Sequence, residues 1–406
     1  MEISPKAFED IITFARASSA TRVNRSGKIE VVANDAPRFD YDPVSLQLRG
    51  LLIEESRTNL LLYSEDFTNA AWTKSSMAVT ADAGSSPDGA TGADKLVPAN
   101  GSSLTACSVR GTVTKAATAT SYTYSIFASA AEFNRIRVFA NDGATTANSA
   151  SATISLADGS IVTAAAASGT FTNASVAVTP FAGSIYRICL TFTSSTETTL
   201  HCRAYVFDSV ATTGNGTSGI YVWGADLEEG TYATSYKPTA SASFTRAAET
   251  AKISANTFSQ MYNQAEGTLF AVIRPNAVDP ARNARFLEVS GGSTVNRVTL
   301  FASTSNRMTA QVRTAGVTRS TLLVSGKFQA LTRVRVAAAF KDNDLALSVD
   351  GGLVTDTSTF PVATPVSELD IGYAGTVPGE TLNGWIEAVQ YFPNRLSNAQ
   401  LQAMTA

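Results

Sequence analysis

The sequence is poor in the residues that build most metal and redox sites. Its 406 residues include one histidine, His201, and three cysteines without CxxC spacing. One histidine excludes a multi-histidine metal site, and three scattered cysteines argue against a disulfide framework or a zinc site. His201 and Cys202 are neighbours, so on a strand they face opposite sides and cannot form a catalytic pair. We therefore expect reduced thiols and a histidine without a catalytic role.

Charge and long apolar runs are also scarce. Charged residues make up 16% of the chain and the net charge is -3, which does not indicate a general nucleic-acid binder. No stretch approaches the roughly 18 apolar residues of a membrane span. The N-terminus lacks the basic start and long apolar core of a signal peptide. We expect a chain made in a cytoplasm, without membrane insertion, whose 44% apolar residues suffice for real cores.

The sequence offers no clear catalytic constellation. Glycoside hydrolysis needs two carboxylates about 5 to 9.5 Å apart, whereas Glu288 and Glu387 each stand alone within the range 253–406. No glycine-rich phosphate loop of the Walker type appears either. We therefore predict no catalytic residues and a protein that is not an enzyme.

Short segments of alternating apolar and polar residues fill the range 61–240. In "SIYRICLTFT", every second residue from Tyr186 to Phe192 is apolar, which is typical of a half-buried strand. Glycine, serine, threonine and asparagine clusters separate these segments, and Asp158-Gly159 suits a tight hairpin turn. Many short strands at this spacing predict a β-sandwich or jelly roll.

A second all-β unit is predicted over 241–406. Its clearest hairpin is "LALSVDGGLVTDT", which turns at Asp350-Gly351, and the chain ends in a short predicted helix with Ser397 as N-cap. Between the two units, the polar range 236–252 contains Pro238 and predicts a linker.

Residues 1–60 do not have the pattern of a self-sufficient domain. Ser4 and Pro5 suit the start of a short helix, and short extended pieces follow. This N-terminal arm must therefore pack on the next domain or on another subunit. Near its end, Glu55 and Arg57 fall on the same face of an extended chain and can pair, which predicts a joint with the first sandwich. The predicted fold class is all-β, with an arm followed by two antiparallel β-sandwich, jelly-roll domains.

Three stretches resemble known families. The segments "FARASSATRVNRSGKIEVVANDAPRFDYDP" and "LRGLLIEESRTNLLLYSEDF" are similar to the N-terminal region of many bacteriophage tail and tail-fibre proteins. "NLLLYSEDFTNAAW" and "IYVWGADLEEGTYATSYKPT" resemble the first and last strands of a carbohydrate-binding-module jelly roll. "LALSVDGGLV" and "LDIGYAGTVPGETLNGWIEAVQYFPNRLSNAQLQAM" resemble the concanavalin A-like, laminin-G-like lectin sandwich. Together these resemblances imply a virion protein with an arm and two sandwiches.

The jelly-roll resemblance also implies a possible cofactor. Modules of that type often hold one structural calcium ion between the end of the first strand and an acidic residue near the last strand. The matching positions are Glu65, Asp66 and Asp226, whose hard oxygen atoms suit calcium. The alternative is that these residues are solvated charges. No other cofactor is expected.

Sugar binding requires aromatic rings together with a few polar groups that fix hydroxyls. Trp385 is the first candidate, because its neighbours face inward and it then faces outward, to bind a sugar or to contact another subunit. The other candidates are Trp72 at the sandwich edge, Tyr373, and Tyr236, for which interdomain packing is the alternative. Trp223 is expected to lie in the core.

These features predict a phage tail-fibre or related receptor-binding protein that attaches the virion to a host-surface polysaccharide without catalysis. Its predicted partners are itself, as a homotrimer, and other virion tail proteins, with no nucleic acid. Its predicted location is the virion tail, after synthesis in the host cytoplasm. Two alternatives stay open: a purely structural capsid or tail decoration protein, and a capsule-degrading glycoside hydrolase.

Overall fold

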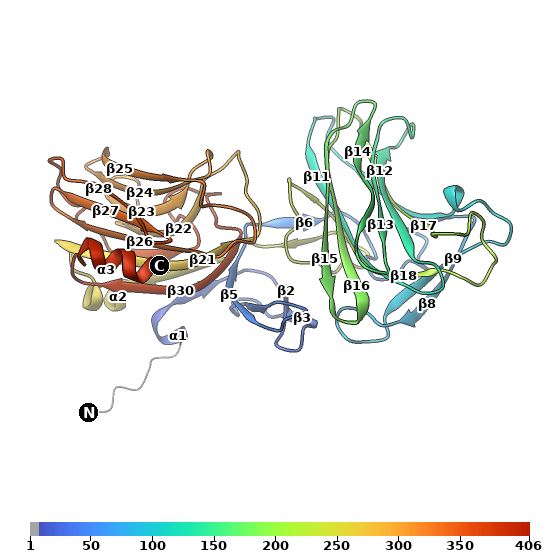
Figure 1. Cartoon of the computed structure of the whole chain (residues 1–406), viewed down its shortest axis with the longest axis horizontal. Coiled ribbons are helices and arrows are strands. Elements are labelled where there is room, and N and C mark those ends of the chain that lie inside the picture. The colour runs from blue at the N-terminus through green and yellow to red at the C-terminus, as the bar shows by residue number, and fades with distance from the viewer. Residues whose placement is uncertain (1–7) are drawn as a thin grey trace.

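The computed structural model describes residues 8–406, so the helix start predicted at Ser4 and Pro5 lies outside the described residues. Two lobes stand side by side, each built from two packed antiparallel sheets, with short helices at their edges (Figure 1). The predicted all-β class is therefore confirmed.

The first lobe consists of two six-stranded sheets. In spatial order, the strands of one sheet are β14 (Ile161–Ser168), β13 (Ser149–Ser155), β12 (Arg135–Asp142), β17 (Thr199–Phe207), β10 (Ser108–Thr114) and β7 (Thr73–Ser75). The strands of the other are β15 (Thr172–Phe181), β16 (Ile185–Thr193), β11 (Ser121–Ala130), β18 (Ile220–Glu229), β9 (Ala93–Pro98) and β8 (Met77–Gly84). Alternating apolar residues, such as Tyr186 and Phe192 of β16, meet between the sheets and form the core.

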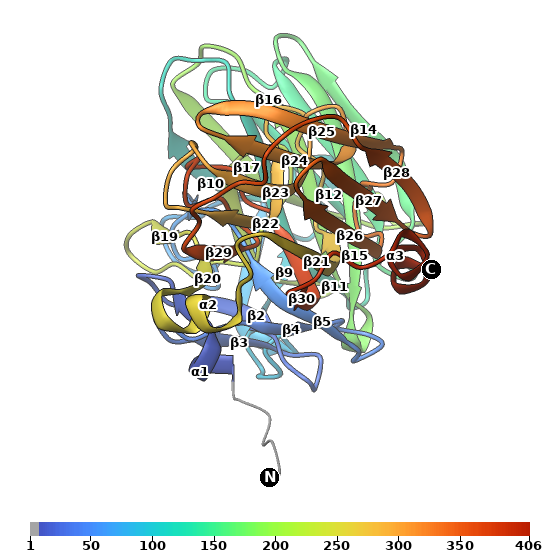
Figure 2. The same cartoon turned by 90° about the vertical axis from the view of Figure 1, so that its left-hand side faces the viewer.

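The second lobe consists of two seven-stranded sheets and faces the viewer in Figure 2. One sheet contains β1 (Thr13–Ala15), β20 (Thr250–Ser254), β29 (Glu368–Ile371), β22 (Ala284–Ser290), β23 (Arg297–Ala302), β24 (Arg307–Thr314) and β25 (Val317–Ser325). The other contains β28 (Gly352–Asp356), β27 (Asp344–Val349), β26 (Val334–Lys341), β21 (Glu266–Pro275), β30 (Gly384–Phe392), β5 (Leu48–Ile53) and β4 (Phe39–Tyr41). The helices are α1 (Phe8–Ile11), α2 (Ala255–Met261) and α3 (Asn398–Thr405).

The N-terminal segment, residues 8–60, completes both sheets of the second lobe. β1 pairs with β20, and β5 pairs with β30, where Leu52 faces Trp385. Four further strands are β2 (Ala20–Val23), β3 (Ile29–Val32), β6 (Arg57–Asn59) and β19 (Phe244–Arg246). β2 and β3 form a hairpin that packs on the first lobe through Ile29, and β6 pairs with β19. The predicted arm therefore packs on both sandwiches of its own chain.

Residues 236–252 connect the lobes as predicted, but this polar crossing has buried anchor points between exposed stretches such as 240–243. Lys237, Arg246 and Glu249 are each at most 1% exposed, although all three carry charge. Buried charges are costly unless they are paired. Each of the three forms an ion pair with a buried residue of opposite charge, as Lys237 does with Asp226 at 2.9 Å.

Local predictions are confirmed where the sequence carries turn or capping signals. β27 and β28 form a hairpin whose turn residues Asp350 and Gly351 have φ of 44° and 78°, as a type I′ turn requires. Gly159, with φ of 75°, lies in the turn between β13 and β14. Ser397 caps α3 and forms a capping box with Gln400.

Candidate functional site

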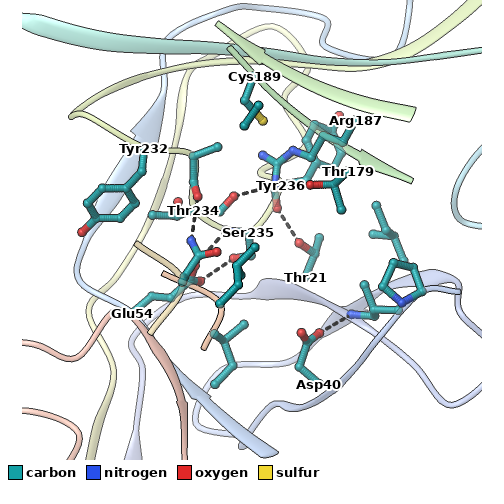
Figure 3. Close-up of a pocket in the computed structure, with 18 of the residues that line it drawn as sticks. Thr21, Asp40, Glu54, Thr179, Arg187, Cys189, Tyr232, Thr234, Ser235 and Tyr236 are labelled. Atoms are coloured by element: carbon teal, nitrogen blue, oxygen red, sulfur yellow. Dashed lines mark hydrogen bonds between the residues drawn. The ribbon is translucent and has the colours of Figure 1, made fainter. Parts of the chain in front are cut away.

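A cleft of about 300 Å³ opens where the N-terminal segment, the first lobe and the second lobe meet (Figure 3). That volume is at the lower end of the roughly 300–1,000 Å³ typical of small-molecule sites. The N-terminal segment contributes residues between Thr21 and Glu54, and the first lobe contributes β15, β16 and the segment that follows β18. The second lobe contributes Asn276, Leu331 and Trp385. None of the three predicted units holds the whole lining.

The first-lobe wall is the outer face of β15 and β16. Even-numbered residues of β16 fill the core, so Arg187, Cys189 and Thr191 face outward into the cleft. Their cross-strand partners in β15 are Thr179, Ala177 and Ser175, respectively. The wall is therefore a ladder of small and hydroxyl-bearing side chains with one cation at its end.

Arg187 is a half-buried cation on this wall. Its Nη1 donates to the carbonyl oxygen of Thr234 at 2.8 Å, and its Nη2 donates to Ser125 Oγ at 3.1 Å. The guanidinium carbon lies 5.5 Å from the centroid of the Phe127 ring, within cation–π range. Both hydrogen-bond acceptors are neutral, so these contacts position the guanidinium without neutralising it.

Tyr236 packs between the first lobe and the N-terminal segment. Its ring is 2% exposed and lies 4.8 Å from the Trp223 ring. Its hydroxyl is 2.7 Å from Ser64 Oγ and donates to Glu65 Oε1 at 2.9 Å, while its carbonyl accepts from Thr21 Oγ1 at 2.5 Å. Trp223 is buried, as predicted. Although Tyr236 belongs to the lining, its ring is not free to stack on a sugar.

Trp385 faces away from its own core, as predicted, but a segment of its own chain covers it. Ile386, the next residue, lies in the core of the second lobe. Trp385 is 5% exposed, its Nε1 donates to Asp40 Oδ2 at 2.8 Å, and the Arg49 guanidinium lies 4.8 Å from its ring centroid. The expected outward exposure is corrected, because β4 and β5 occupy its outer side, while its candidate role in sugar binding stays a prediction. It belongs to the lining of the cleft.

The lining of the cleft includes two carboxylates with opposite electrostatics. Burial raises the pKa of Asp40 to about 6, although hydrogen bonds such as that from Val23 N partly offset it. Burial also raises the pKa of Glu54, but the guanidinium groups of Arg246 and Arg38 outweigh it and bring the net pKa well below its usual range. Asp40 therefore gains a proton near neutral pH far more readily than Glu54 does.

Behind the cleft, buried ion pairs join the N-terminal segment to the crossing between the lobes. Arg38 Nη2 donates to Glu54 Oε2 at 2.8 Å, and Arg38 Nε donates to Glu249 Oε1 at 2.7 Å. Arg16 Nη1 also donates to Glu249 Oε1, at 2.8 Å. Sequence reasoning missed this network because its members lie up to 233 positions apart. The one signal was Glu54, a charge inside an apolar run.

Two other aromatic candidates lie outside the cleft. Trp72 is 1% exposed and belongs to the first-lobe core, where its Nε1 donates to the carbonyl oxygen of Tyr63 at 3.0 Å. The prediction that it binds sugar at an edge is therefore corrected. Tyr373 is half-buried in the second lobe, where burial, followed by the charge of Asp370, raises its pKa.

The three predicted calcium ligands are not gathered into one site. Asp226 is fully buried and pairs with Lys237, whose ammonium supplies the positive charge there. Glu65 accepts from Tyr236, and Asp66 is exposed and closes a local turn. Residues 8–406 contain no group of three acidic, histidine or cysteine side chains placed to hold a metal ion. This arrangement does not support the predicted calcium site.

Glu55 and Arg57 form the predicted pair at the joint. Arg57 Nε donates to Glu55 Oε1 at 2.9 Å, and the Arg57 guanidinium lies 5.2 Å from the Tyr232 ring centroid in the first lobe. Glu55 also reaches the second lobe, where Oε2 accepts from Arg282 Nη1 at 2.5 Å and its backbone N–H donates to Asn383 Oδ1 at 2.8 Å. The pair therefore contacts both lobes.

Glu288 has no acidic neighbour in the sequence, but in the structure Asp370 of β29 lies directly opposite it. Both side chains are fully buried and neither lines the cleft. Glu288 Oε2 is 3.3 Å from Arg297 Nη1, and Asp370 Oδ2 accepts from Gly375 N at 2.8 Å. The sequence missed this pairing because it joins strands about 80 residues apart. Arg297 therefore contacts Glu288, whereas the loop N–H of Gly375 contacts only one of the two Asp370 oxygens and Oδ1 has no hydrogen-bond partner among residues 8–406.

The predicted opposite orientation of His201 and Cys202 is confirmed. Cys202 lies in the first-lobe core, while His201 lies on the opposite face of β17. Burial, followed by the charges of Arg110 and Arg203, lowers the pKa of His201 to about 4, so it is neutral at pH 7. The three cysteines are free thiols, as expected.

Comparison with known proteins gives partial structural likenesses only. No known family model matches the chain, and no curated protein matches it. The carbohydrate-binding module CBM40 of Ruminococcus gnavus IT-sialidase, solved with α2,3-sialyllactose, is 22% identical at a TM-score of 0.32, over 36% of this chain and 84% of the module. The leech intramolecular trans-sialidase is 16% identical at a TM-score of 0.33, over 38% of this chain and 27% of that one. A pentraxin of Limulus polyphemus is 10% identical at a TM-score of 0.29, over 36% of this chain and 72% of the pentraxin chain.

Among the helices of residues 8–406, none is both long and apolar enough to cross a membrane.

Proposed function

We propose that the protein is a bacteriophage tail protein that attaches the virion to a host-surface glycan, and that the cleft between the lobes holds the glycan. The observation that carries this proposal is the cleft itself, with its hydroxyl-bearing wall and Arg187. Hydroxyl and guanidinium groups recognise the hydroxyls and acidic groups of sugars. The resemblance of the N-terminal segment to phage tail proteins supports the virion setting.

Binding without catalysis is part of the proposal, because the two carboxylates of the lining are engaged. Asp40 accepts from Trp385 Nε1, and Glu54 accepts from Arg38 and Ser235. A glycoside hydrolase needs one carboxyl group to protonate the leaving oxygen and another to activate water or attack carbon. Incubation with host capsule should therefore release no reducing ends. Release that Asp40→Asn abolishes would instead support the hydrolase alternative.

A homotrimer located in the tail remains part of the proposal for reasons of affinity. Three linked weak sites raise the effective affinity by roughly 10² or more. Burial of the N-terminal segment is not an argument for assembly, because that segment packs on its own chain. Sedimentation of the purified protein measures the oligomeric state directly.

A bulky substitution on the cleft wall tests whether the cleft binds the glycan. Ala177 is an exposed residue of β15 on the cleft wall, and Ala78 is an exposed residue of β8 at the opposite edge of the same sheet. We predict that Ala177→Trp lowers binding to host polysaccharide on a glycan array at least tenfold, because the indole occupies the cleft. Ala78→Trp should bind like the original protein.

Equal binding by both tryptophan variants would overturn the cleft assignment. If the original protein binds no glycan at all, yet is incorporated into particles, then the structural decoration alternative is favoured. Circular dichroism and thermal melting of both variants check that the fold is unchanged.

A further inference from the structure

We infer that the cleft selects carboxylate-bearing sugars and that Arg187 receives the carboxylate. This inference rests on the glycan binding proposed above and names the class of glycan. It starts from the positive charges on the lining, which are Arg22, Arg49 and Arg187.

Two of these three arginines already have a carboxylate partner. Arg22 Nη2 is 2.7 Å from Glu30 Oε1, and Arg49 Nη2 is 2.6 Å from Asp42 Oδ2. Arg187 has no ion pair with any carboxylate of residues 8–406, since its two hydrogen bonds go to a carbonyl and a hydroxyl oxygen. Its charge is therefore the one on the lining that a ligand can neutralise.

The carboxylates on the same sheet face form no direct ion pair with Arg187. Asp226 and Glu228 pair with Lys237 instead, whose Nζ lies 2.9 and 3.2 Å from them. This arrangement has two consequences. Lys237 offsets only part of the two negative charges, and Arg187 attracts Asp226 at longer range without forming a direct ion pair with it.

Arg187 also has unused donors in a suitable place. A guanidinium carries five N–H groups in a planar fork. The Nε of Arg187 is buried, but Nη1 and Nη2 each use only one of their two N–H groups within the protein. Thr179 lies directly opposite Arg187 on β15, and both side chains lie on the cleft wall in Figure 3. A carboxylate can accept two parallel bonds from such a fork, while an adjacent hydroxyl can bind a ring hydroxyl.

The wall is built to hold this guanidinium in place. Contacts to Phe127, Ser125 and Thr234 fix its position before any ligand arrives. Preorganised donors lose less entropy on binding than mobile ones, and partial burial strengthens the attraction to an anion. A neutral sugar can use the hydroxyls but leaves the charge of Arg187 unpaired.

The test uses an array of uronate-, sialate- and pyruvate-bearing oligosaccharides, each printed beside its carboxyl-reduced counterpart. The original protein should bind carboxylate forms at least tenfold better than the reduced forms, since a hydrogen bond to a charged group is worth about one to two decades in affinity. Arg187→Gln should abolish this preference and leave weak binding to both members of each pair. Arg187→Lys should retain part of it.

Arg137 provides a matched control on the other sheet of the first lobe. Its guanidinium lies 5.0 Å from the Phe139 ring centroid and donates to Ser151 Oγ at 3.1 Å, so its surroundings are like those of Arg187, but it is not on the cleft lining. Arg137→Gln should keep the full preference for carboxylates.

The outcomes separate this inference from the function on which it rests. Equal binding to acidic and reduced sugars, or an equal loss in both glutamine variants, overturns the role of Arg187 and leaves glycan binding intact. A protein that binds no oligosaccharide or host polysaccharide overturns both. Melting temperatures within about 2 °C of the original identify variants whose binding can be compared.

Discussion

One carboxylate, Asp40, links the N-terminal segment to the second lobe. It accepts from Val23 N at 2.6 Å and from Trp385 Nε1 at 2.8 Å. It is 4% exposed, so its charged form is poorly solvated. The contact between the first fifty residues and the last strand of the second lobe therefore depends on a titratable group.

The raised pKa of Asp40 predicts a pH dependence of stability. Burial raises its pKa to about 6, above the ordinary value of 3.8. Between pH 4 and 6 the folded protein holds a proton that the unfolded chain has lost, so Asp40 contributes stability at low pH that is lost as pH rises through 6. The resulting decrease in the free energy of unfolding is about 3 kcal/mol.

Urea unfolding of the original protein and of Asp40→Asn at pH 4 and pH 6.5 measures this contribution. The free energy of unfolding of the original protein, relative to the variant, should fall as the pH rises. A constant difference between the two proteins would contradict the prediction.

For single residues, the sequence indicates which way a side chain faces but not what covers it. Alternation with Ile386 places Trp385 outside the core of its sandwich, which is correct. Its hydrogen-bond partner Asp40 lies 345 positions away. Burial of Trp385 therefore depends on a chain crossing that no local pattern encodes.

Local sequence signals predict the position and the buried face of a single strand or turn, but they do not predict which strand it pairs with. The buried side of β16 and the turn at Asp350 and Gly351 follow from alternation and turn chemistry, and both are confirmed. The pairing of β5 with β30 was not predictable, because an apolar run such as "LRGLLI" can join any open sheet edge. Tertiary contacts, in this case the edge of β30, make that choice.

The docking of β5 on β30 depends on Gly50. Its φ is 117°, and a Cβ at this position would lie 2.3 Å from the carbonyl oxygen of Ile386. We predict that Gly50→Ala separates β5 from β30 and destabilises the protein by several kcal/mol, since the clash is with backbone atoms that cannot rotate away. Hydrogen exchange of residues 48–53 should accelerate.

Gly101→Ala is the control, because Gly101 has φ of 73° but no heavy atom within 4 Å of the added Cβ. It should cost about 1–2 kcal/mol from backbone strain alone. If the two alanine variants have equal stability, then close packing at Gly50 is unimportant.

At the scale of the whole molecule, the joint at Glu55 and Arg57 couples the two lobes. Arg57 contacts Tyr232 of the first lobe, and Glu55 binds Arg282 of the second. The cleft lies between the same lobes, so its shape depends on their relative position. The two charges predict the joint from the sequence, but the cleft was not predictable, because it is assembled from three segments that are distant in the chain.

Arg57→Ala tests the coupling. Removing one partner of a buried ion pair costs about 3–5 kcal/mol when the other charge is left unpaired. Glu55 keeps Arg282 as a partner, so we expect a cost below that range. We predict a lower melting temperature and separation of one calorimetric transition into two, as the lobes begin to unfold independently. Arg333→Ala removes the exposed pair with Glu387 and should cost less than about 1 kcal/mol.

An unchanged calorimetric profile and unchanged assembly of Arg57→Ala would mean that the joint does not couple the lobes.

The pairing of β5 with β30 also sets the order of events during synthesis. Leu52 leaves the ribosome more than 300 residues before Trp385, its partner. At about 5–20 residues per second, the delay is roughly 20–70 s. During that time the first lobe can fold, since both of its sheets lie within one continuous stretch of chain. The apolar strand "LRGLLI" can pair with β4 at once, but its edge toward β30 stays open during that time, so we expect the nascent chain to need chaperones early at its N-terminal end.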